Sequence, residues 1–336
     1  MFDKIIYSIV FHILHILYSQ TITLGSFFIG QARKGGNFSK KKLSWYMNTG
    51  YQIGLKSPIY YSGKYESSDK IDIIISNHIH SYDLFLQTSI INQLSKKNIY
   101  YVFKKVCIFI PGLGFNLCCA PDIKLNKQME YDLDNLVTSI KKMKSGIIVI
   151  LPEGTRFTPE KRVLAQKYSR DNNLPIFNNT LFPKMKGMWL ICNILTQENR
   201  MGNIIDLTTM VENCKNQKVV FKNLITKDIG NTLCVINSYN VPPLQIIQDY
   251  DVFKKWFLDI WKIKDNILEN MHTVNDTHIY TRLPSNINIK DLSVLLVVII
   301  LFTYLMIKTN GKYLGYSFIV SYIITIIRYK LLKKKL

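Results

Sequence analysis

Hydrophobic and polar residues divide this chain into three regions. Residues 5–32 contain no charged side chain, and the uncharged runs 292–307 and 313–327 follow near the other end. A bilayer crossing needs ~20 residues, so the first run is long enough to be a membrane anchor. It could instead lie in the interface or be a cleaved signal peptide, although such peptides have a core of only ~7–15 apolar residues. The two later runs indicate an apolar helical hairpin that spans or re-enters a membrane.

The region between these ends has the pattern of an α/β domain, with a mixed sheet flanked by helices. Short β-branched and apolar runs predict strands at Ile71–Ser76, Asn98–Phe103, Gly146–Leu151, Ile204–Val211 and Leu233–Ser238. Apolar residues at helical spacing predict helices over 82–94, 129–144 and 256–268. In the second helix, Leu133, Leu136, Val137 and Ile140 are expected to face inward, and Ile263 belongs to the apolar face of the last.

The predicted organisation is a membrane anchor with a basic flank at 1–43, an α/β domain at 44–285 and a membrane hairpin with a basic tail at 286–336. Basic residues next to apolar segments tend to stay on the cytosolic side. The chain ends Lys333-Lys334-Lys335-Leu336, which resembles a dilysine retrieval signal, although a plain basic flank gives the same pattern. The expected location is therefore an internal membrane such as the endoplasmic reticulum, with the α/β domain in the cytosol.

The net charge of +20 predicts an anionic partner. No nucleic-acid-binding module is recognisable, and the apolar ends favour a bilayer containing anionic lipids. The six cysteines form no C-x-x-C pair and no zinc-type spacing, so we expect reduced thiols and no metal site.

Two polar motifs directly follow apolar runs. The first, residues 77–83 (Asn-His-Ile-His-Ser-Tyr-Asp), pairs His78 with Asp83, and a carboxylate can hold a histidine in the tautomer that accepts a proton. The second, residues 152–157 (Pro-Glu-Gly-Thr-Arg-Phe), offers an Arg156 fork and backbone N–H groups that suit a phosphate. Each alone could be structural, as a buried histidine or a surface turn. Together they indicate an enzyme that deprotonates a hydroxyl on a phosphate-bearing substrate.

These motifs resemble those of the glycerolipid acyltransferases, the 1-acylglycerol-3-phosphate and lysophospholipid acyltransferase family. Residues 77–83 are similar to its N-H-x4-D motif, and Leu151–Phe157 to its Phe-Pro-Glu-Gly-Thr-Arg motif. Leu181–Gly187 resembles the fourth motif, with Lys184 in place of an arginine, and Lys124 stands where the second block has an arginine. The segments 206–208 and 256–268 are similar to the lysocardiolipin acyltransferase branch.

The resemblance implies an acyl-CoA-dependent O-acyltransferase that acylates the free hydroxyl of lysophosphatidic acid or another lysophospholipid. It implies His78 as general base, oriented by Asp83. The residues that it implies for substrate binding are Glu153, Gly154, Thr155, Arg156, Lys124 and Pro183. It implies no metal and no bound cofactor, since acyl-CoA is a co-substrate.

Two other functions remain open from the sequence. A membrane-bound lipid hydrolase could use the same histidine, but it would need a nucleophile, and the chain has no G-x-S-x-G elbow. A non-catalytic, basic membrane-binding protein would use the charge and the apolar ends without any reaction.

Overall fold

The computed structural model describes residues 52, 57–79, 83–105, 107, 122–125, 129–214, 229–271, 279–284, 304 and 308. The chain divides into a sheet unit, Tyr51–Val102 with Met143–Pro284, and a second unit, Met1–Gly50 with Phe103–Lys142 and Ser285–Leu336. Apart from two single positions, the predicted membrane segments lie outside the described residues. None of the helices in the described ranges has the length and apolar character that a bilayer crossing requires.

The sheet unit is built on one mixed sheet, as the sequence predicted. Its strands are β1 (Ile59–Gly63), β2 (Ile71–Ser76), β3 (Ile99–Lys104), β5 (Gly146–Ile150), β6 (Met201–Val211), β7 (Thr232–Tyr239) and β8 (Thr281–Arg282). They run in the order β3-β5-β2-β6-β7-β1-β8. Neighbours from β3 to β6 are parallel, as are β7 and β1, whereas β6 with β7 and β1 with β8 are antiparallel.

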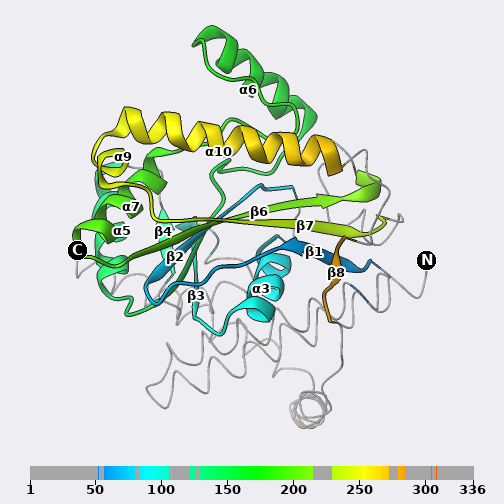
Figure 1. Ribbon diagram of the computed structural model, residues 1–336, viewed down its shortest axis with the longest axis horizontal. Helices are drawn as coiled ribbons and strands as arrows, with labels where there is room; N and C mark the ends of the chain where they lie inside the picture. The colour runs from blue at the N-terminus through cyan, green and yellow to red at the C-terminus, as the bar shows by residue number, and fades with distance from the viewer. Residues whose placement is uncertain are drawn as a thin grey trace. The chain divides into compact units, whose positions relative to one another are not determined.

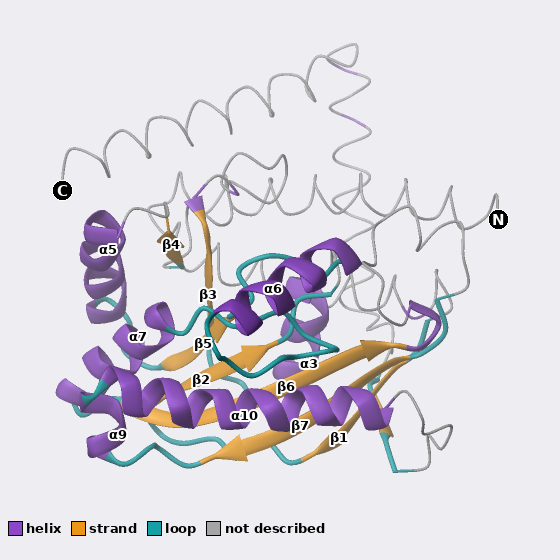
Figure 2. Ribbon diagram, turned by 90° about the horizontal axis from the view of Figure 1, so that it is seen from above, coloured by secondary structure: helices purple, strands orange, loops and turns teal. Residues whose placement is uncertain are grey.

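Helices cover both faces of this sheet (Figure 1). The helix α10 (Tyr250–Met271) lies along one face beside α7 (Lys186–Gln197) and α9 (Leu244–Gln248), and α3 (Asp83–Leu94) lies on the other. Covering both faces explains why every residue of β2 and β5 is buried. The helix α6 (Pro159–Asp171) stands farther from the sheet than α10 in Figure 1, and Figure 2 shows the same elements from above.

The buried face of α10 follows helical spacing, with Phe253, Phe257 and Trp261 stacked ring on ring at 6.0 and 5.7 Å between centroids. Ile263, which we expected on this face, is 46% exposed, while the next residue, Lys264, is fully buried. The expectation for Ile263 was therefore wrong, because the charged side chain beside it takes the inward position.

The second unit contributes β4 (Ile123–Leu125) and α5 (Met129–Lys141), which pack against each other. Leu136 and Ile140 are buried as predicted, but Leu133 is 39% exposed, so its predicted inward position was wrong.

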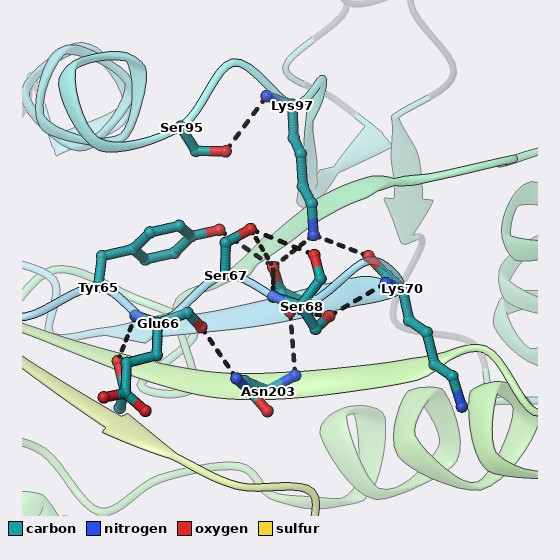
Figure 3. Close-up of polar contacts among 10 residues, drawn as sticks. Tyr65, Glu66, Ser67, Ser68, Lys70, Ser95, Lys97 and Asn203 are labelled. Atoms are coloured by element: carbon teal, nitrogen blue, oxygen red, sulfur yellow. Dashed lines mark hydrogen bonds and ion pairs between the residues drawn. The ribbon is translucent and has the colours of Figure 1, made fainter.

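The amino end of β2 is held by a buried carboxylate. Asp72 is fully buried and accepts hydrogen bonds from the Ser68 hydroxyl at 2.6 Å, from Lys97 Nζ at 2.7 Å and from the backbone N–H of Asn203 at 3.0 Å. Figure 3 shows Lys97 and Asn203 converging on this cluster from the segment after α3 and from β6. Charge-assisted bonds therefore connect three segments at the end of the sheet opposite to the two motifs.

Candidate active site

The two motifs meet because the strands before them are parallel neighbours. Ile75 of β2 lies opposite Ile150 of β5, so both chains leave the sheet at the same edge. The backbone N–H of Phe157 then donates to the carbonyl oxygen of His78 at 2.7 Å. The sequence prediction that both motifs follow strand ends is confirmed, and the contact places them side by side.

His78 and Asp83 form a close hydrogen-bonded pair. Nδ1 of His78 lies 2.6 Å from Oδ2 of Asp83, the first residue of α3, and the Asp83 side chain is only 3% exposed. The positive end of the helix dipole favours an ionised carboxylate at this position. An ionised Asp83 accepts the Nδ1 proton, which leaves Nε2 with a free lone pair. The imidazole, 23% exposed, is thus arranged to accept a proton at Nε2.

Asn77 anchors the histidine loop to the next strand. Its amide nitrogen donates to the carbonyl oxygen of Thr209 at 2.8 Å, and its amide oxygen accepts from the backbone N–H of Thr209 at 2.9 Å. Asn77 is fully buried, so both ends of its amide are used within the protein. This positioning role explains why an asparagine precedes the histidine.

Glu153 connects three segments of the site. Its Oε1 accepts from the backbone N–H of His78 at 2.8 Å, and its Oε2 accepts from the backbone N–H of Leu181 at 3.1 Å. Burial raises the pKa of Glu153 to about 8, while these two N–H groups and the charge of Lys264 act to lower it. Both oxygens are engaged inside the protein, so the geometry supports a positioning role, and contact of Glu153 with substrate stays a prediction.

The turn after Glu153 has a left-handed residue at its centre. Gly154 has φ +65, a conformation that suits glycine, and its N–H donates to the carbonyl oxygen of Leu151 at 2.9 Å. Lys184 lies across this turn, because its Nζ is 3.6 Å from the point where a Gly154 side chain would begin. The backbone N–H of Lys184 donates to the carbonyl oxygen of Pro152 at 2.8 Å. The Glu-Gly-Thr-Arg motif and the motif at Leu181–Gly187 therefore share one turn.

A further cation at this turn, Lys161, was not singled out by the sequence. Its Nζ donates to the hydroxyl of Thr155 and, at 3.2 Å, to the carbonyl oxygen of Arg156. The signal that could have found it is the N-cap Thr158, which starts α6 and places Lys161 in the first turn. Lys161 and Lys184 thus lie at the turn that also carries Arg156, which favours an anion there.

The last long helix fixes the loop that carries Pro183. Asp265 of α10 accepts the backbone N–H groups of Asn178 at 3.0 Å, Asn179 at 2.8 Å and Thr180 at 2.9 Å. Nε1 of Trp261 donates to the carbonyl oxygen of Leu181 at 3.1 Å. The loop therefore has little freedom before it reaches Pro183, which is buried, and Lys184.

A buried ion pair joins α10 to β6. Lys264 and Asp206 are both fully buried and in direct contact, and Lys264 Nζ also donates to the carbonyl oxygen of Leu207 at 2.9 Å. Burial raises the pKa of Asp206, and the charge of Lys264 acts against that rise. Asp206 lies opposite Ile75 of β2, so this pair supports the strand that leads to His78.

Lys124 lies on β4 of the second unit and is partly exposed, and its substrate-binding role stays a prediction. Residues 80–82 of the histidine motif lie outside the described residues.

Comparison with known proteins agrees with the resemblance in the motifs. The family model described as Acyltransferase matches residues 60–188. A probable 1-acyl-sn-glycerol-3-phosphate acyltransferase 5 of Arabidopsis thaliana is 25% identical over 65% of this chain, and the match spans only 58% of that protein. Lysophosphatidylinositol acyltransferase 10 of Caenorhabditis elegans is 21% identical over 76% of this chain and 68% of its own.

The fold has a solved counterpart. The crystal structure of the 1-acyl-sn-glycerophosphate acyltransferase PlsC from Thermotoga maritima superposes with a TM-score of 0.54, covering 82% of this chain and 97% of that one. The two sequences are 13% identical, so this likeness concerns the fold alone.

Proposed function

Since the motifs and the fold of this chain are similar to those of glycerolipid acyltransferases, we propose that it transfers an acyl group from acyl-CoA to the free hydroxyl of a lysophospholipid. The observation that carries the proposal is the 2.6 Å pair of His78 and Asp83 beside the cationic turn at Gly154. The names of the relatives support lysophosphatidic acid or a lysophosphatidylinositol as the acceptor class.

The base in this reaction is Nε2 of His78. An alcohol is almost fully protonated at neutral pH, so its oxygen becomes a strong nucleophile only as a base removes the proton. The acceptor oxygen attacks the thioester carbonyl while its proton passes to Nε2, and Asp83 stabilises the imidazolium that forms. When the tetrahedral intermediate collapses, the C–S bond breaks and the imidazolium returns the proton to the leaving CoA thiolate. The substrate hydroxyl is the nucleophile, so no enzyme serine or cysteine takes part.

The acceptor phosphate binds at the turn of residues 154–156. Arg156 offers a planar pair of N–H donors, and Lys161 and Lys184 add two positive charges around the same turn. Glu153 keeps this turn next to His78 through its bond to the His78 backbone. Binding the phosphate here holds the glycerol hydroxyl near the base, which lowers the entropic part of the barrier.

The test uses the purified full chain with radiolabelled acyl-CoA and a panel of lysolipids. We expect acylated product with release of free CoA, and loss of product in His78→Ala. His278→Ala, which removes a histidine outside the motif, is the matched control and should leave turnover unchanged. Undiminished transfer by His78→Ala would exclude the proposed base. Lysolipid breakdown without CoA release would instead identify a hydrolase, and lipid binding without turnover a non-catalytic protein.

A further inference from the structure

Gln87 is a polar side chain in the protein interior, one turn after Asp83 on α3. It is fully buried, and neither its Nε2 nor its Oε1 has a hydrogen-bond partner among the residues that the structure describes. Its neighbours in the helix, Leu86, Ile90 and Ile91, are apolar and at most 3% exposed. Buried side-chain amides are nearly always hydrogen-bonded, so an amide without a protein partner at this depth indicates a bound polar group.

The next residue of the helix shows how a buried polar group is usually satisfied. The hydroxyl of Thr88 donates to the carbonyl oxygen of Leu84 at 2.6 Å and contacts the hydroxyl of Tyr101. Gln87 differs, because an apolar side chain of similar size could fill its position and leave no polar group unpaired. Packing alone therefore does not account for a glutamine at this position, and residues that break such local rules are expected at functional sites.

The position of Gln87 on the helix directs its amide toward the histidine pair. Residues four apart lie on the same face of a helix, with Cβ atoms about 5–6 Å apart, and helical side chains lean toward the preceding turn. Here that turn begins with Asp83, whose Oδ2 lies 2.6 Å from Nδ1 of His78. An ionised carboxylate has about four acceptor sites, so Asp83 can accept hydrogen bonds besides the one from the ring.

We propose that Gln87 is a positioning residue, which holds internal water that donates a hydrogen bond to the carboxylate of Asp83. Water suits both ends of an amide because it donates and accepts, and buried water is found where otherwise unsatisfied polar groups face each other. The bond keeps the carboxylate, and through it the ring of His78, in the orientation that presents Nε2 to the acceptor hydroxyl. This inference rests on the proposed function, because Gln87 affects the rate only if His78 accepts the proton.

The first experiment compares two glutamines of α3 in the full chain. Gln87→Met keeps the length of the side chain and removes its amide, and Gln93→Met makes the same change at an exposed position. We expect Gln87→Met to lower kcat on the order of tenfold, the effect of about one hydrogen bond, with little change in either KM and no loss of Tm. Gln93→Met should leave kcat unchanged. If methionine lowers Tm, Gln87→Leu takes its place. An unchanged kcat in the folded variant would overturn the proposal.

Action through Asp83 makes a second requirement. In a protein that already carries Asp83→Asn, Gln87→Met should lower kcat by less than about twofold, because the carboxylate that the water orients is gone. A tenfold loss in both backgrounds would contradict a role that passes through Asp83.

A measurement without turnover separates this inference from the proposed function. The proton between Nδ1 of His78 and Asp83 gives a downfield proton NMR resonance, which is identified by its loss in His78→Ala. We expect Gln87→Met to shift this resonance and Gln93→Met to leave it in place. An unchanged resonance in Gln87→Met would overturn the inference. A shifted resonance in a protein without transferase activity would retain the contact with Asp83 and reject the proposed function.

Discussion

The buried ion pair between Lys264 and Asp206 makes a strong prediction about stability. Replacing Lys264 by methionine keeps the length of the side chain but removes a charge that is fully buried between Asp206 and the Leu207 carbonyl oxygen. The Asp206 carboxyl then lies in the core without its cation. Breaking a buried pair by removing one partner costs about 3–5 kcal/mol, because the remaining charge is uncompensated. Asp206→Asn leaves the ammonium alone and should cost a similar amount.

The same helix offers a control for this experiment. Lys262 pairs with Asp259 at 3.1 Å, but these side chains are 52% and 59% exposed. An exposed pair contributes only about 0.2–1 kcal/mol, so Lys262→Met should change stability little. In a domain of this size 1 kcal/mol shifts Tm by about 2–4 °C, so Lys264→Met should lower Tm by roughly 6–20 °C.

Thermal unfolding of the full chain, followed by tryptophan fluorescence in one detergent, measures these shifts. The double variant Lys264→Met with Asp206→Asn has neither charge. Its loss of stability should therefore be smaller than the sum of the two single losses, by about 0.5–3 kcal/mol. If Lys264→Met costs no more than Lys262→Met, the buried pair does not stabilise the fold. Additive losses in the double variant would show that the two side chains are not coupled.

Three further predictions concern the site. Asp83→Asn should lower kcat on the order of 10²- to 10⁴-fold with little change in KM, because the amide does not hold the imidazole in the required tautomer. An unchanged kcat would show that Asp83 takes no part in the reaction. Arg156→Ala should raise the KM of the acceptor roughly 10- to 150-fold, because it removes a charge-assisted bond of about 1.5–3 kcal/mol. It should leave the KM of acyl-CoA nearly constant. Arg162→Ala is the control and should change neither KM. Burial raises the pKa of Glu153 from 4.5 to about 8, so the folded protein keeps a proton that the unfolded chain has lost between these values. This stabilisation is complete below pH 4.5 and is lost as pH rises to about 8, at no more than about 1.4 kcal/mol per pH unit. Between pH 4.5 and about 8, the Tm of Glu153→Gln should therefore fall less with rising pH than the Tm of the unaltered protein. If Tm plotted against pH gave parallel curves for the two proteins, the raised pKa of Glu153 would be refuted.

The strands that lead into the motifs could be predicted from the sequence because their signals are local. Each is a short apolar run bounded by polar residues, and β2 was predicted with its observed limits. The common edge of the two motifs also follows from the sequence, since parallel strands with helical connections present their carboxyl ends together. The longest strand, β6, begins at Met201, before the predicted start at Ile204. The prediction missed its first residues because a glycine and an asparagine interrupt the apolar run there.

The buried charged residues were not predicted from the sequence, because their burial depends on partners that are distant along the chain. Asp72 and Lys264 are charged, and hydropathy alone would place them at the surface, yet both are fully buried. A charged residue is buried only where specific partners satisfy it, and the partner of Lys264, Asp206, lies on a different element. The helix α6 was missed for another reason. Its apolar residues Val163, Leu164 and Tyr168 are more than half exposed, so the helix has no inward apolar stripe from which it could be predicted.

The site separates the roles of its acidic and basic residues. Glu153 and Asp265 accept backbone N–H groups from other segments, and Asp83 accepts the ring proton of His78, so the carboxylates hold the site together. The side chains of Lys161 and Lys184 instead lie at the turn formed by residues 154–156. Loss of a positioning carboxylate should therefore disturb the geometry of the reaction and act on kcat, whereas loss of a cation should act on acceptor affinity. Cations at this turn, close to the positioned histidine, suit the proposed binding of a phosphate-bearing lipid.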